Sequence, residues 1–261
     1  MRIPLLLSIP GLLLLTTACD APEPPVPSDK LVTPYQIIME YSVEAEGPDP
    51  AEVVARARLY DVTQAYDVFG NAGTVELVGE DAVFADDVEL DIETRTTIGS
   101  TLWVDYSQAV SSAPSHTFEM RRSGDERIVS TIPVPDPFDV DPIGEVRGDG
   151  SSTVTVTWSP VLDGATIDLS LEPLDDDCIS IIGGGPAAHV ETGVDDVGSY
   201  RLNTSGYHSA DKDCRYDLVM TRRYVEPASG TWFKEGQEIP STDVWAIGLR
   251  TTRAPFTAVQ R

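Results

Sequence analysis

Alternating apolar and polar residues recur along the chain from about Ile37 and predict β-strands. In the clearest run, residues 53–60, every second position is apolar: Val53, Ala55, Ala57 and Leu59. A period of two is typical of a strand with one buried and one solvent-facing side. About seven such runs precede residue 133, and no stretch shows the period of an amphipathic helix. The pattern predicts an antiparallel sandwich or small barrel over residues 35–132.

A proline-rich segment, residues 133–150, interrupts this alternation. Four prolines fall between Pro133 and Pro142, and proline cannot donate the hydrogen bonds of a strand ladder. Alternation then resumes in residues 151–261. We therefore predict an all-β chain with two tandem antiparallel β-sandwich domains, residues 35–132 and 151–261, joined by a Pro/Asp-rich linker.

The N-terminus carries an apolar run instead of an alternating pattern. Residues 3–15 form an apolar region broken by Pro4 and Pro10, and the small residues 16–18, Thr-Thr-Ala, lead directly into Cys19. This is the layout of a secretory signal, and it is short for a spanning helix, which needs about 20 apolar residues. We expect residues 1–18 to be a signal peptide. Residues 19–34 form a tether whose prolines favour an extended, polyproline-like geometry.

The small residues before Cys19 resemble the lipobox of bacterial lipoproteins. The resemblance implies cleavage before Cys19, a diacylglycerol on its sulfur and an acyl chain on its amine. Each buried methylene contributes about 0.8 kcal/mol, so two or more chains anchor a protein stably in a membrane. The tether would hold the first domain about 40 Å from the bilayer. An ordinary secretory signal with a chance cysteine is the alternative.

The lipobox resemblance also implies a location. The protein would lie in the bacterial cell envelope, with its domains in the periplasm or on the cell surface. In enteric bacteria an aspartate after the cysteine, here Asp20, resembles an inner-membrane retention signal. That rule does not hold in all bacteria, so the choice between inner and outer membrane stays open.

Two stretches of the second domain resemble known β-sandwich families. Residues 154–160, Val-Thr-Val-Thr-Trp-Ser-Pro, look like the second strand of a fibronectin type III domain, whose tryptophan, here Trp158, packs across the core. Residues 196–202 resemble the Asp-x-Gly-x-Tyr-x-Cys stretch of immunoglobulin-like domains, with Leu202 in place of the cysteine. The matching positions are Asp196, Gly198 and Tyr200. The resemblance implies structural roles for these residues and a corner hydrogen bond from Tyr200 to the backbone.

Net charge excludes some classes of partner, and the cysteine count predicts a disulfide. The net charge is −25, and residues 1–200 hold 9 Lys and Arg against 36 Asp and Glu. A field this negative disfavours nucleic acid and anionic lipid as partners. If Cys19 carries lipid, Cys178 and Cys214 remain, and two cysteines in an exported chain usually form a disulfide. Such a bridge would contribute roughly 2–4 kcal/mol to stability.

The sequence predicts no catalytic residue and no metal ligand set. The chain has three histidines and no Gly-x-Ser-x-Gly motif, although a nucleophile–histidine pair is needed for a hydrolytic triad. Clustered aspartates leave calcium as a weak alternative, because calcium takes 6–8 oxygen ligands. These clusters are Asp136/Asp139/Asp141, Asp175–Asp177 and Asp195–Asp196.

The predicted function is a non-enzymatic envelope lipoprotein with a binding or scaffolding role, held on the membrane through Cys19. Its partner would be an envelope protein or a glycan, and no cofactor is expected. One alternative is a glycan- or peptide-binding module in which Trp232 and Phe233 stand exposed on a loop over residues 230–236. A metal-dependent hydrolase is the second alternative.

Overall fold

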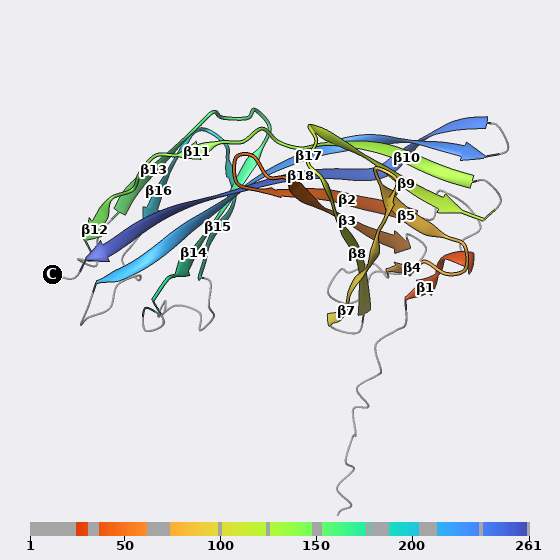
Figure 1. Cartoon of the computed structure of the whole chain (residues 1–261), viewed down its shortest axis with the longest axis horizontal. Coiled ribbons are helices and arrows are strands. Elements are labelled where there is room, and N and C mark those ends of the chain that lie inside the picture. The colour runs from red at the N-terminus through yellow and green to blue at the C-terminus, as the bar shows by residue number, and fades with distance from the viewer. Residues whose placement is uncertain are drawn as a thin grey trace, which may run out of the picture.

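A computed structural model describes most of the chain from residue 25 on (Figure 1). Part of the predicted tether belongs to the folded body, because Val26 pairs with Val75 and Ser28 is fully buried. The described residues are 25–30, 37–61, 74–98, 101–123, 126–147, 153–175, 178, 188–203, 213–234 and 237–259. Cys19 and the signal peptide lie outside them. Within these ranges no helix is long and apolar enough to cross a membrane. The regular secondary structure of the described residues is strand, apart from one 3-10 turn, η1 (Ser28–Lys30), which confirms the all-β prediction.

Ten strands of the described residues end at or before Pro133. They are β1 (Val26–Pro27), β2 (Ile37–Glu46), β3 (Glu52–Asp61), β4 (Val75–Glu76), β5 (Ala82–Ala85), β6 (Val88–Glu89), β7 (Asp91–Ile98), β8 (Thr101–Ser111), β9 (Ser115–Arg122) and β10 (Glu126–Pro133). Two lie within residues 133–150, the predicted linker: β11 (Asp139–Val140), which pairs with a strand of the small sheet, and β12 (Glu145–Arg147), which pairs with the last strand. Six follow: β13 (Thr153–Ser159), β14 (Thr166–Pro173), β15 (Ala188–Asp195), β16 (Ser199–Asn203), β17 (Cys214–Lys234) and β18 (Gln237–Val259).

The longest feature is the hairpin of β17 and β18, whose strands have 21 and 23 residues. Strands in globular proteins usually have 3–10 residues. The two strands pair antiparallel from Cys214↔Ala258 to Lys234↔Gln237. Figure 1 shows this hairpin in blue, running from one end of the molecule to the other. It therefore contributes to both halves of the structure.

The first core is enclosed by one curled sheet with the strand order β6-β5-β9-β10-β17-β18-β2-β3-β8-β7. The curl brings Tyr41 of β2 onto Phe118 of β9, with ring centroids 4.6 Å apart. Strand β3 behaves as its alternation predicts, because its four apolar positions are each at most 2% exposed. They are Val53, Ala55, Ala57 and Leu59. Strand β18 is parallel to β2.

The second core lies between the other end of the same large sheet and a separate three-stranded sheet. The large sheet contributes β14, β15, β12 and the other ends of β17 and β18, and the small sheet has the order β11-β13-β16. Trp158 of β13 is buried here at 3% exposure. The predicted disulfide is present: Cys178 is bonded to Cys214, which ties the segment after β14 to the start of β17.

The chain passes from the first core to the second between Val134 and Phe138. This crossing segment lies directly over Gly248 of β18. A Cβ atom on Gly248 would stand 2.6 Å from both the Pro133 carbonyl oxygen and Pro135 Cδ. Only glycine leaves room for so close an approach of another backbone.

The sequence-based division assigned all of residues 151–261 to the second domain. In the structure, parts of β17 and β18 belong to the first core instead. Val244 pairs with Met39 of β2, and Thr231 pairs with Val129 of β10. Val244 and Ala246 belong to the first core. Alternation shows that one side of a strand is buried, but it does not show which strands lie beside it.

Candidate functional site

The outer side of the first sheet carries the candidate site, a shallow depression of about 250 Å³ over β2, β3, β7 and β8. It is lined by Glu40, Ser42, Arg56, Ala57, Arg58, Glu93 and Asp105. Strand β3 turns Ala55 and Ala57 inward, so Arg56 and Arg58 point outward. Cross-strand register then places Glu40 and Asp105 on either side of Arg58.

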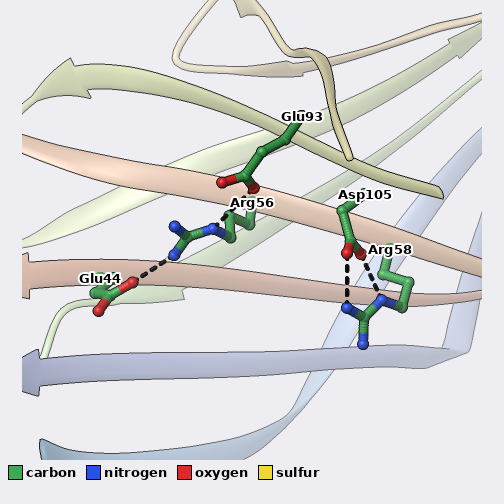
Figure 2. Close-up of polar contacts among 5 residues, drawn as sticks. All are labelled: Glu44, Arg56, Arg58, Glu93 and Asp105. Carbon is green, nitrogen blue, oxygen red and sulfur yellow. Dashed lines mark hydrogen bonds and ion pairs between the residues drawn. The ribbon is translucent and has the colours of Figure 1, made fainter. Parts of the chain in front are cut away.

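Both arginines are engaged by carboxylates, as Figure 2 shows. Arg58 binds Asp105 in a bidentate manner, with 2.9 Å between Nη2 and Oδ2 and a second bond from Nε to Oδ1. Arg56 donates from Nε to Glu93, at 3.1 Å, and from Nη1 to Glu44. Burial alone would lower the pKa of Arg58, but its hydrogen bonds with Asp105 and Tyr60 raise it. Both guanidiniums are therefore charged, and the paired carboxylates balance their charge.

Glu40 differs from the other carboxylates of this face. Its polar contact within the described structure is the Tyr60 hydroxyl, which donates to Glu40 Oε2 at 3.5 Å, near the limit of a hydrogen bond. Beside Glu40, on β18, lies Trp245, which is 51% exposed. In the part of the chain that the structure describes, the site therefore combines two arginines paired with carboxylates, a carboxylate (Glu40) that forms no ion pair, and an exposed indole (Trp245).

The predicted structural residue Asp196 lies in a buried network at the end of the second sandwich. Trp158 Nε1 donates to Asp196 Oδ1 at 2.6 Å, and Arg222 Nε donates to Oδ2 at 2.7 Å. The Arg222 guanidinium also lies over the Phe138 ring, 4.3 Å from its centroid. Sequence reasoning missed Arg222, although alternation from Cys214 along β17 places it on the inner side.

Gly198 and Tyr200 lie beside this network. Gly198 has a φ of +83°, and its carbonyl accepts a hydrogen bond from the Trp158 amide at 3.0 Å. The left-handed conformation favours glycine at this position. The Tyr200 hydroxyl donates to Glu191 Oε2 at 3.1 Å, so it bonds a side chain, whereas the family resemblance implied a backbone acceptor.

The two residues of the proposed aromatic platform lie in a strand and not on the expected loop. Trp232 and Phe233 fall inside β17, in register with Ile128 and Arg127 of β10. The Arg127 guanidinium lies 4.7 Å from the centroid of the Phe233 ring, which is half-buried. The Trp232 side chain lies outside the described residues. Arg127 thus covers a ring that was expected to be exposed.

His116 is the histidine whose surroundings the structure describes. It is fully buried, and its Nδ1 lies 2.6 Å from Asp86 Oδ2. Ser130 faces the same core from the neighbouring strand, but Ser130 Oγ and His116 Nε2 make no hydrogen bond. A hydrolytic triad needs that bond and access for a substrate. His208 and the His189 side chain lie outside the described residues.

One aspartate in each of two acidic clusters has a side-chain partner in the described structure. Asp175 pairs with Arg215 at 2.7 Å, and Asp141 accepts a hydrogen bond from Thr157. Asp176 and Asp177 lie outside the described residues. Among the residues that the structure does describe, no group of three or more His, Cys, Asp or Glu side chains could hold a metal ion.

Comparisons with known proteins identify no family for this chain. No family model matches it, and no curated protein matches it. Among solved structures, it is similar to an adhesin of Yersinia pseudotuberculosis, InvE, with 14% sequence identity and a TM-score of 0.20. The match covers 85% of this chain and 59% of the adhesin chain. A TM-score this low does not establish a shared fold.

Proposed function

We propose that the protein is a non-enzymatic lipoprotein of the bacterial cell envelope, held on a membrane by acyl chains on Cys19. In this role the β-sandwich body binds or scaffolds another envelope component. The observation that carries the proposal is the apolar run that ends in small residues and a cysteine, followed by a proline-rich tether. Such a tether keeps a folded body away from the bilayer surface.

The shared hairpin supports a binding or scaffolding role. Strands β17 and β18 run through both halves, and the crossing segment is fixed to them by Arg222 and Arg250. Arg222 donates to the Asp136 carbonyl at 3.0 Å, and Arg250 donates to the Pro135 carbonyl at 3.0 Å. Continuous strands and buried contacts of this kind hold two sandwiches in one orientation, which suits a body that presents a fixed surface to a partner.

Fractionation combined with cross-linking tests this proposal. The full-length protein is produced in a bacterium, and membranes are separated before and after chemical cross-linking of intact cells. We expect the wild type to sediment with membranes, to need detergent for extraction and to form a discrete cross-linked complex. The Cys19→Ser variant should appear in the soluble fraction. A wild-type protein that is equally soluble, or that forms no complex while on the membrane, contradicts the proposal.

A further inference from the structure

We propose that the outer face around Trp245 and Glu40 binds a basic segment of a partner protein, with one lysine or arginine side chain seated between the indole and the carboxylate. The inference rests on the proposed binding role and gives it a surface and a partner chemistry. The face is formed by β18, β2 and β3, and it adjoins the depression described above.

Trp245 is exposed although its strand is central. Strand β18 is paired on both sides, with β17 and with β2. The Trp245 side chain is therefore exposed because it points outward from the sheet, and not because it lies at a sheet edge. Val225 pairs with Ile247 two positions away on the same face, and Val225 is 38% exposed. Trp245 and Val225 form an exposed apolar strip along β17 and β18, whereas Ile247 between them is 6% exposed and adds little surface. Exposed apolar surface next to polar surface is typical of a contact site.

Glu40 gives this strip a charged border. In the register of β18 and β2, Trp245 lies directly beside Glu40. The neighbouring acids Glu44, Glu93 and Asp105 each bond an arginine. Among the described residues, Glu40 receives only the 3.5 Å contact from Tyr60. A lysine or arginine side chain satisfies both halves of such a site. Its aliphatic stem packs on the indole, and its charged end reaches the carboxylate.

The charges of this face and of the whole chain indicate that the partner is positively charged. Arg56 and Arg58 are bound to carboxylates, so the depression offers an anion no guanidinium that lacks a counter-charge. The chain as a whole carries a net charge of −25, and a field of that sign attracts basic partners and repels anionic ones. A basic protein segment therefore fits this face, and an anionic lipid surface does not.

Peptide binding to the detergent-extracted full-length protein tests the inference. The probes are a fluorescent lysine octapeptide and a matched glutamate octapeptide, titrated at low and at physiological salt. The variants are Glu40→Gln, Trp245→Thr and Trp245→Phe. The control is Glu145→Gln, which removes one exposed carboxylate from β12 in the second sandwich.

We expect the lysine peptide to bind the wild type and the glutamate peptide not to bind. Glu40→Gln and Trp245→Thr should each raise the Kd about threefold to fivefold, as for a single exposed ion pair or cation–π contact. Trp245→Phe should have a smaller effect because it keeps a ring, and Glu145→Gln should have none. Equal thermal unfolding midpoints will show that the variants are folded.

The opposite results overturn the inference. An unchanged Kd for Glu40→Gln and Trp245→Thr, an equal effect of Glu145→Gln, absence of binding to the lysine peptide, or binding of the glutamate peptide would each do so. Such results leave the proposed function intact, because the fractionation and cross-linking experiment measures membrane attachment and contact and does not depend on this face.

Discussion

The side chains of Asp196 and Arg222 form an ion pair in which neither has any exposed surface, with 2.7 Å between Arg222 Nε and Asp196 Oδ2. Arg222 also donates to the carbonyl oxygens of Asp136 and Pro160. The pair therefore joins β17, the loop before β16, the loop after β13 and the crossing segment. Loss of one partner would leave a buried charge without compensation.

Arg222→Met should destabilise the protein strongly. Breaking a buried pair by removing one partner typically lowers the free energy of unfolding by about 3–5 kcal/mol. Urea denaturation of the purified protein measures the change. The control is Arg253→Met, because Arg253 is 40% exposed and its partners Glu172 and Glu46 are also exposed. That change should cost less than about 1 kcal/mol, and equal effects of the two variants would contradict the assigned role of Arg222.

Gly248→Ala should destabilise the junction between the two cores. The added Cβ would lie 2.6 Å from the Pro133 carbonyl oxygen and from Pro135 Cδ, so the crossing segment must move. Overpacking of this kind costs about 1–3 kcal/mol. The backbone of Gly248 needs no left-handed φ, so the effect is steric alone. A melting temperature equal to that of the wild type would show that the segment does not cross β18 at this point.

Removal of the disulfide should lower stability without a change of fold. Cys178 and Cys214 are 36 residues apart in the sequence, and a bridge closing such a loop contributes roughly 2–4 kcal/mol, mainly by restricting the unfolded chain. The measurement is denaturation of the Cys178→Ser/Cys214→Ser variant against wild type with and without reductant. Reductant should lower the wild type to the level of the variant and leave the variant unchanged. Insensitivity of the wild type to reductant would contradict this.

Stability at acidic pH should depend on Glu119. Its hydrogen bond with Arg121 lowers the pKa of the Glu119 carboxyl, and burial opposes the shift only in part. A lowered pKa contributes stability that is fully present above the ordinary value of about 4.3 and is lost as pH falls through the folded-state pKa. The stability difference between wild type and Glu119→Gln, at most about 1 kcal/mol, should therefore shrink from about pH 6 to about pH 3. A constant difference over that range would refute the assignment.

Local pattern was sufficient to predict individual strands. The alternation in β3 correctly separated its buried positions from Arg56 and Arg58, because a period of two depends only on neighbouring residues. The disulfide could also be predicted, since two cysteines remained after Cys19 was assigned to lipid. Both predictions rest on information contained in short stretches or in simple counts.

Register and strand neighbours could not be predicted in this way. The partners of Arg56 and Arg58 come from β2, β7 and β8, and nothing in β3 specifies them. Likewise, residues 244–251 show a strand pattern, but only the fold pairs them with β2. The burial of Arg222 was missed but could have been found, because the inward alternation of Cys214, Tyr216, Leu218 and Met220 extends to it. Its partner Asp196 could not be found in this way.

Attachment of lipid at Cys19 is the central claim, and mass spectrometry of the mature N-terminus tests it most directly. The full-length protein is extracted from bacterial membranes with detergent, digested, and its N-terminal peptide is identified. The predicted result is a peptide that begins at Cys19, lacks residues 1–18 and carries the added mass of a diacylglyceryl group with an acyl chain on the amine. A peptide that begins elsewhere, or one that begins at an unmodified Cys19, would contradict the account.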